Sequence, residues 1–302
     1  MLLMAGAFST VSAQTPITEV LKNAGDAASY PGYDQLIVFD STYTDMQESG
    51  LTYVVNHTLT RVLNSHGAAD LSVVKFGYDP QSAYVEIRKA VIYKNDGRVI
   101  SLDVNRVMDY PAPARAIYWG AREKMMETGR LEPGDAVEVV MFRKGFTYAL
   151  LTPGDDDRYI PPMKGQFYDI VEFFGSNPIK SKVYQVAVPA DKPLQYEFYN
   201  GDVQASCRMI NGQMVYSFSR KDVVPVKSEP RMVAMSDVAP KLLVSTTPTW
   251  NAKSTWFYKV NEDYGSFGAD DEIKAKVSEI LRGAKTEMDS VSRLTHWCAD
   301  EI

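Results

Sequence analysis

The sequence predicts a mainly β protein: an antiparallel sandwich-type domain followed by a short C-terminal helical segment. Between residues 60 and 145, alternating apolar and polar residues are interrupted at short intervals by Gly, Pro, Asn and Asp, as in a meander of antiparallel strands. Similar alternation recurs from 181 to 220, where Asn200-Gly201 and Asn211-Gly212 favour hairpin turns. From residue 269 the apolar positions follow the helical period instead.

The composition is that of an ordinary globular protein. The 302 residues are 45% hydrophobic and 23% charged, and a chain of this length can hold one large or two modest domains. The net charge of −6, without any block of Lys or Arg, argues against nucleic acid as a partner. Tyrosines (18) outnumber phenylalanines (12), which favours half-buried sheet faces where the ring packs and the hydroxyl stays in water.

Residues 1–13 are predicted to be a signal peptide. The stretch from Leu2 to Phe8 is apolar, and Val11 and Ala13 stand at positions −3 and −1 of a cleavage site before Gln14. The alternative is a frayed apolar N-terminus. No other apolar run approaches the roughly 20 residues that a membrane-spanning helix needs. We therefore expect an exported protein, periplasmic or extracellular, without a membrane span.

A leader, residues 14–35, comes next and contains one short helical pattern that ends at Gly25. Asn95-Asp96-Gly97 indicates a hairpin, because Asn and Gly tolerate positive φ. Turns are also indicated at Ser65-His66-Gly67 and at Glu132-Pro133-Gly134-Asp135. Strands are predicted at 36–45, 51–64, 71–78, 83–94 and 98–103, and a further strand follows the turn at 132–135 within residues 129–145.

The alternating strand pattern is less regular in the middle of the β region. Residues 116–126 fit either a strand edge or a short helix, and residues 146–176 indicate a long loop. A Pro-rich connection later includes a predicted strand within residues 242–260 that leads to a Trp250/Trp256 pair. Four further strands are predicted at 181–189, 194–200, 205–210 and 214–220.

Residues 269–302 indicate two helices. Asp270 is a plausible N-cap of the first, and Thr286 followed by Asp289 resembles a capping box for the second. The second helix has an apolar side, and no C-cap, Gly or Pro precedes Ile302. A segment of this kind after many strands is expected to be the start of a further domain, and we expect its apolar side to be exposed. That side is formed by Met288, Val291, Leu294, Trp297 and Cys298.

The two cysteines suggest little chemistry. Cys207 and Cys298 lie in segments that belong to different predicted domains, and we expect both to be free thiols. Cys207 with His57 and a carboxylate could form a nucleophilic site, but its strand pattern favours a small buried hydrophobic residue. His296 and Cys298 are two residues apart, so on a helix they point about 200° apart.

Metal sites and familiar catalytic motifs are not indicated. Histidines at 57, 66 and 296 have no metal-ligand spacing, and the loop at 154–158 carries three successive aspartates without the alternation of a calcium loop. A solvated turn is therefore favoured over calcium binding. The sequence contains no P-loop, GxGxxG, GxSxG or HExxH motif, so we expect no catalytic residue and no cofactor in this chain.

The most binding-like cluster is Tyr118, Trp119, Arg122 and Glu123. An exposed aromatic pair beside an arginine can stack on a sugar or anchor a peptide. The alternative is that these aromatic side chains are interior residues beneath the long connection. Carbohydrate or peptide binding through this cluster is one hypothesis for the function.

Four ordered stretches carry a resemblance to a known family. They are R-V-L-N-x-x-G (61–67), A-V-I-Y-K-N-D-G-R-V-I (90–100), A-I-Y-W-G-A-R-E-K (116–124) and R-L-E-P-G-D-A-V-E (130–138). Together they resemble DUF3857, a β-rich domain that precedes transglutaminase-like domains in exported bacterial proteins. The resemblance extends over about 36–260, with a sub-boundary considered near 180. It implies that residues 269–302 are the first helices of a transglutaminase-like domain truncated at Ile302.

The resemblance places any catalysis outside this chain. The family's catalytic Cys lies further on, with His and Asp later still, and Cys298 does not match that position. The first hypothesis is therefore a non-catalytic N-terminal β module, covalently linked to a transglutaminase-like cysteine peptidase or acyltransferase, that positions substrate or partner. The alternatives are a free-standing carbohydrate- or peptide-binding β-sandwich and an enzyme that acts through Cys207.

Overall fold

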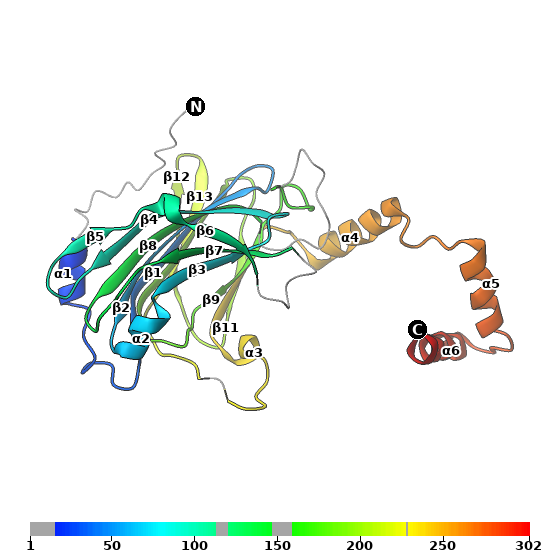
Figure 1. Ribbon diagram of the computed structural model, residues 1–302. Helices are drawn as coiled ribbons and strands as arrows, with labels where there is room; N and C mark the ends of the chain where they lie inside the picture. Colours follow the sequence, from blue (N-terminus) through cyan, green and yellow to red (C-terminus); the bar gives the residue numbers. More distant parts are fainter. Residues whose placement is uncertain (1–15, 113–119, 147–158, 228) are drawn as a thin grey trace. The chain divides into compact units, whose positions relative to one another are not determined.

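The computed structural model describes residues 16–112, 120–146, 159–227 and 229–302, and it confirms a mainly β fold with a helical C-terminal segment (Figure 1). The chain divides into two compact units, Met1–Pro248 and Thr249–Ile302. None of the described helices combines the length and apolar character that crossing a membrane requires. The predicted signal peptide and the aspartates at 155–157 lie outside the described residues.

One large sheet dominates the first unit. All its neighbouring strands pair antiparallel except β1 and β10, which are parallel. The eight strands follow the spatial order β12 (Gln204–Ile210), β13 (Gln213–Val223), β10 (Ile179–Pro189), β1 (Gln35–Met46), β2 (Thr52–Val62), β8 (Ala136–Gly145), β4 (Ala83–Tyr93) and β5 (Val99–Ser101).

Two three-stranded sheets pack on one face of the large sheet, which we call the packed face. Met126 of one small sheet belongs to the same core cluster as Val137 and Val139 of β8, and Leu242 of the other joins Tyr184 of β10 in a second core. The cross-strand register places these large-sheet side chains on the same face. The small sheets are β3 (Val73–Tyr78), β7 (Arg122–Glu127) and β6 (Met108–Pro111), and β11 (Gln195–Tyr199), β14 (Lys241–Ser245) and β9 (Tyr168–Glu172).

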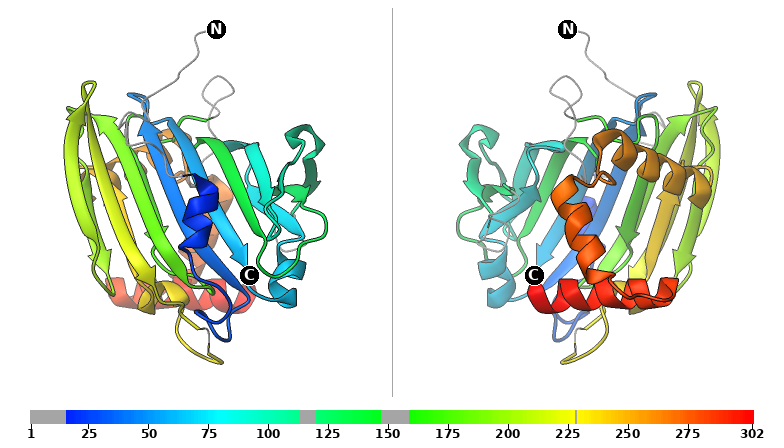
Figure 2. Two further views of the ribbon diagram at one scale, coloured as in Figure 1. Left: turned by 90° about the vertical axis from the view of Figure 1, so that its left-hand side faces the viewer. Right: turned by 90° about the vertical axis from the view of Figure 1, so that its right-hand side faces the viewer.

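The opposite face of the large sheet, which we call the open face, is covered at one end by α1 (Ile17–Lys22) (Figure 2, left). There a third core cluster contains Leu36, Leu59 and Ala136. Arg61 of β2 fixes the leader, because its Nη1 donates to the carbonyl oxygens of Leu21 and Gly25 at 3.0 and 2.8 Å. The predicted short helix of the leader is thus confirmed. It covers one end of the open face and not the rest.

Two β-bulges change which residues reach the open face. The register of β1 shifts between Ile37 and Phe39, and that of β4 shifts between Ile87 and Lys89. A bulge inserts one extra residue and re-aims the side chains beside it. As a result Phe39, Arg88 and Lys89 all lie on the open face, whereas strict alternation through β4 would put Arg88 and Lys89 on opposite faces.

Several local predictions need correction. Ser65-His66-Gly67 is not a simple turn but opens a helix, α2 (Ser65–Asp70), because the Asn64 side chain caps it by accepting from the Gly67 amide at 2.9 Å. Asn200-Gly201 does not close a hairpin: β11 pairs with β14 and β12 with β13, so the chain crosses from a small sheet to the large one. The remaining short elements of the first unit are η1 (Val104–Arg106) and α3 (Met235–Val238).

Two expectations about organisation also change. The strand predicted within residues 242–260 ends at Ser245, and Trp250 and Trp256 both lie in the helix that follows. Residue 180 lies inside β10, which pairs with β1 and β13, so it is not a boundary between sheets. Residues on both sides of 180 therefore contribute to one continuous sheet.

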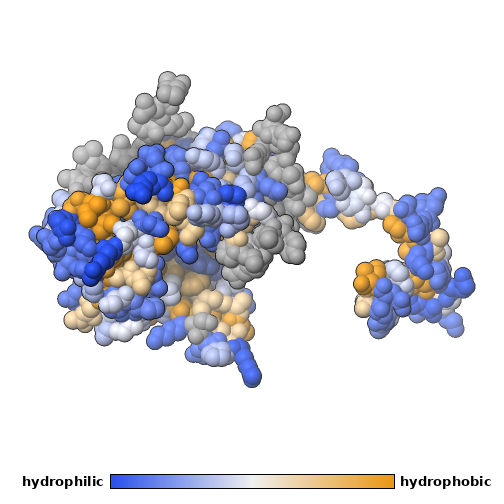
Figure 3. All heavy atoms as spheres, viewed as in Figure 1, coloured by the Kyte–Doolittle hydropathy of each residue, from blue (hydrophilic) through white to orange (hydrophobic). Residues whose placement is uncertain are grey.

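The second unit consists of α4 (Trp250–Tyr264), α5 (Asp271–Ile280) and α6 (Glu287–Glu301). Both predicted caps are confirmed, since Asp270 accepts from the Ile273 amide at 2.8 Å and Thr286 from the Asp289 amide at 3.1 Å. None of the three helices contains a buried residue, and hydrophobic residues lie among charged ones on their surface (Figure 3).

Candidate functional site

Half of the predicted binding cluster lies within the described residues. Tyr118 and Trp119 lie outside the described residues, whereas Arg122 and Glu123 are neighbours on β7. Successive residues of a strand point to opposite faces, so these two side chains diverge. Arg122 shares its side with the buried Met126. The described half of the cluster therefore does not converge on one ligand.

Arg122 instead belongs to an ionic cluster around Asp109. Its Nε donates to Oδ1 of Asp109 at 2.8 Å, while Lys124 Nζ and the Tyr78 hydroxyl both reach Oδ2 at 2.7 Å. Burial alone would raise the pKa of Asp109, but the hydrogen bonds from Lys124, Tyr78 and Arg122 outweigh it and lower the pKa to about 2. Burial and the bond to Asp109 raise the pKa of Tyr78 to about 12. At neutral pH the cluster is a fixed cross-link of three strands.

The Cys207 hypothesis finds no geometric support. Cys207 is exposed, so the expectation of a small buried hydrophobic residue is wrong. It lies on the packed face of β12, because it pairs with Tyr216, whereas His57 lies on the open face of β2. Strands β13, β10 and β1 separate the two residues. A thiolate at 207 therefore has no access to the imidazole.

His57 takes part in a different network, centred on a buried carboxylate on the open face. Glu138 is 1% exposed, and its Oε1 lies 2.7 Å from His57 Nε2 and 2.8 Å from Lys89 Nζ. The Tyr93 hydroxyl donates to Oε2 at 2.7 Å. Burial would raise the pKa of Glu138, but the bonds from Lys89, Tyr93 and His57 together lower it. Burial and the hydrogen bond to Glu138 raise the pKa of Tyr93. Glu138 is thus an ionised acceptor that holds three side chains of the neighbouring strands β2 and β4 in place.

Beside this network, aromatic side chains of three neighbouring strands form a row, which we call the aromatic strip: Tyr43 of β1, Tyr53 of β2 and Phe142 of β8. Tyr43 pairs with Val55, and Val55 pairs with Phe142. The rings of Tyr53 and Phe142 stack with centroids 6.1 Å apart. All three aromatic residues are partly exposed.

Charged and polar groups border the strip. The Arg88 guanidinium carbon lies 3.6 Å from the centroid of the Phe142 ring, so the bulge on β4 supplies a cation over an aromatic face. Gln185 of β10 pairs with Tyr43, and its Nε2 donates to Ser217 Oγ at 3.4 Å. A row of partly exposed rings beside such donors can contact an extended ligand and fix its orientation.

Sequence reasoning missed this strip. Its members are ten or more residues apart along the chain, and each occupies an unremarkable position in an alternating strand. Only the pairing β1–β2–β8, together with the bulge that redirects Arg88, brings them together. The excess of tyrosine over phenylalanine indicated half-buried sheet faces in general, but it could not say which face.

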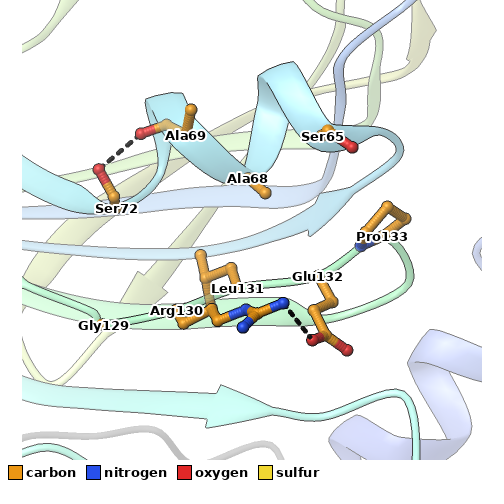
Figure 4. Close-up of a pocket in the computed structure, with 9 residues that line it drawn as sticks. All are labelled: Ser65, Ala68, Ala69, Ser72, Gly129, Arg130, Leu131, Glu132 and Pro133. Atoms are coloured by element: carbon orange, nitrogen blue, oxygen red, sulfur yellow. Dashed lines mark hydrogen bonds and ion pairs between the residues drawn. The ribbon is translucent and has the colours of Figure 1, made fainter.

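Two other features of the first unit are weaker candidates for a functional site than the aromatic strip. A shallow cavity of about 540 Å³ lies between α2 and residues 129–133, and it is bordered by small side chains and by the exposed Arg130 and Glu132 (Figure 4). Asp34, His66 and Asp70 offer ligand atoms within 4.8 Å of one another, a proximity that histidine spacing alone did not indicate. His66 and Asp70 are exposed, and His66 already pairs with both aspartates, so we assign no metal to this group.

Comparisons with known proteins identify the family. A family described as "Domain of Unknown Function with solved-structure structure (DUF3857)" matches residues 48–227, more than half of the chain. The chain belongs to the DUF3857 family. A comparison with curated proteins finds no match.

Solved structures extend the likeness of fold. The DUF3857 chain resembles a protein of Parabacteroides distasonis described as a "putative protease", with a TM-score of 0.67 and 17% identity over 89% of this chain and 50% of that one. It thus spans about half of that protein. An M1 zinc metallopeptidase of Deinococcus radiodurans matches over 70% of this chain and 42% of that one, at a TM-score of 0.37 and 13% identity, too low for any argument.

Proposed function

We propose that this chain is the non-catalytic β module of an exported transglutaminase-like cysteine peptidase or acyltransferase, and that it positions a peptide or glycan. Family membership supports a module, and the fold shared with half of a protein described as a protease is consistent with a longer enzyme. The observation that carries the proposal is the aromatic strip, a partly exposed row of rings on a sheet face that α1 covers at one end.

The strip suits binding better than catalysis. Its residues project from three central strands of an eight-stranded sheet, so their positions are fixed before a ligand arrives and little ordering cost is added on binding. His57, the histidine on this face, directs Nε2 to the buried Glu138. In the proposed enzyme, the reacting thiolate, a histidine and an aspartate come from the transglutaminase-like domain, while this chain holds the substrate.

The helical unit supports the same proposal. We infer that residues 269–302 begin the transglutaminase-like domain. Met288 and Val291 of α6 are 74% and 53% exposed, and both lie on the predicted apolar side of that helix. Exposed apolar side chains on one side of a helix are suited to packing against further structure. The predicted exposure of this side is confirmed for these two residues.

A direct test is the coding sequence beyond Ile302. Continuation into a domain with Cys, His and Asp in that order would support the proposal. A stop codon directly after Ile302 would contradict it and leave the free-standing carbohydrate- or peptide-binding protein, which would use the same strip.

Binding provides the second test. Peptides and oligosaccharides are titrated calorimetrically against the chain and against Tyr53→Ala and Phe142→Ala, with Tyr110→Ala, an exposed ring on another sheet, as the control. Loss of a central aromatic contact costs about 2 kcal/mol, so we expect roughly 30-fold weaker binding for the strip variants. Unchanged affinity in both strip variants would remove the strip from the proposal.

A further inference from the structure

The edge of the large sheet at β12 is long and unprotected. All seven of its residues are exposed, it contains no proline, and its register with β13 is uninterrupted from Gln204 to Ile210. At the opposite edge, β5 has only three residues, and β6 of a small sheet has four and ends in Pro111. Proteins normally shorten, bend or charge such edges because their free N–H and C=O groups pair with other strands.

The hairpin geometry shows which groups are free. Asn211 and Gly212 both have positive φ (50° and 81°), as in a two-residue type I′ turn, so Ile210 and Gln213 form the hydrogen-bonded pair next to it. Hydrogen-bonded and non-bonded pairs alternate along an antiparallel ladder. The N–H and C=O groups of Ala205, Cys207 and Met209 therefore point away from β13. Within the described ranges, β12 pairs with β13 alone.

The sequence of β12 complements itself when reversed. Cys207 is the middle residue of the strand. Antiparallel pairing about Cys207 sets Met209 opposite Ala205, Arg208 opposite Ser206 and Ile210 opposite Gln204. Large side chains then face small or polar ones, and the single charge of the strand meets no like charge. The three outward-facing residues would exchange about six main-chain hydrogen bonds across the two-fold axis.

From these features we propose that a second copy of this chain pairs with it through β12, antiparallel and centred on Cys207. The pairing joins the two large sheets into one. The two Cys207 residues face each other as a hydrogen-bonded pair, with Cα atoms about 5.5 Å apart, a separation that a disulfide can span. The contact area is small, so the dimer forms at micromolar concentration or above.

A charge swap tests this pairing. Cys207→Lys places two ammonium groups opposite each other, and Cys207→Glu places two carboxylates there. By sedimentation velocity at about 50 μM, we expect the wild-type chain to dimerise and each variant to be monomeric, with circular dichroism confirming that both are folded. Mixing the two variants should restore a dimer, and native mass spectrometry should show one copy of each. Ile100→Lys at the β5 edge is the matched control and should dimerise like the wild-type chain.

Cross-linking provides an independent readout. In a Cys298→Ser chain, diamide oxidises two Cys207 thiols to a disulfide, and the two electrons and two protons reduce diamide to the hydrazine. We expect a covalent dimer, whereas Cys298 alone, in Cys207→Ser, should give none. A wild-type chain that stays monomeric at 50 μM, or a mixture of the charge variants that does not form the mixed dimer, would overturn the proposal. Dimers of both charge variants would show that another surface is used.

Discussion

Replacing Glu138 by glutamine tests whether the buried carboxylate on the open face stabilises the fold. Removing one partner of a fully buried charge pair costs about 3–5 kcal/mol. Lys89 is 49% and His57 26% exposed, so water solvates their polar ends after the change. The cost then approaches that of the lost charge-assisted hydrogen bonds, and we expect the free energy of unfolding to fall by about 2 kcal/mol.

The assay is urea unfolding followed by circular dichroism, with Glu127→Gln, an exposed glutamate on β7, as the matched control. The control should change stability by less than about 0.5 kcal/mol. Because the folded-state pKa of Glu138 is lowered, its contribution is present above the unfolded pKa and is lost as pH falls through the folded one. The gap between wild type and Glu138→Gln should therefore narrow on acidification. Equal stability of the wild-type chain and Glu138→Gln at pH 7 would refute the reasoning, and so would a stability difference between them that does not depend on pH.

Three further outcomes are expected. Asp109→Asn should lower the free energy of unfolding by about 1–2 kcal/mol at pH 7. The difference from the wild-type chain should vanish as pH falls through about 2, the folded-state pKa of Asp109. Urea titrations at several pH values measure this difference. Gly67→Ala should destabilise by about 2 kcal/mol or more, because the new Cβ would lie 2.0 Å from the Asp34 carbonyl oxygen, whereas Gly77→Ala, with open space around it, should be nearly neutral; similar melting temperatures for the two would contradict this. Both cysteines are free and exposed, so two thiols per folded chain should react with Ellman's reagent, and a count below two would show that one is covered.

Local sequence signals predicted the fold where the decisive contact is also local. The caps at Asp270 and Thr286 and the turn at Asn211-Gly212 depend on residues within four positions, and each formed as expected. Asn200-Gly201 carries the same signal, but its strands find partners in different sheets, because long-range pairing decides what a turn connects. The strand predicted to lead to Trp250 ends at Ser245, because Thr249 caps a helix by accepting from the Ala252 amide at 3.1 Å.

The candidate site could not be predicted in the same way. Arg88 reaches Phe142 only because β4 gains an extra residue at the bulge, and Tyr43 joins the strip only through the pairing of β1 with β2. Neither the bulge nor the strand pairing can be recognised from the spacing of these residues in the sequence. By contrast, the predicted pair Arg122 and Glu123 is adjacent in sequence, and that adjacency sends the two side chains to opposite faces of β7.

The two proposals place constraints on each other. Two strands that pair antiparallel about a two-fold axis perpendicular to their sheet present the same face on the same side. Dimerisation through β12 would therefore set both aromatic strips on one side of a continuous sheet. Strand β2 is four strands from β12, so at about 4.8 Å per strand the strips would lie roughly 40 Å apart. A polymer that spans this distance would bind the dimer more tightly than a short fragment, since the second contact becomes intramolecular. The same polymer should lose that advantage with Cys207→Lys, although the affinity of a short fragment would not change.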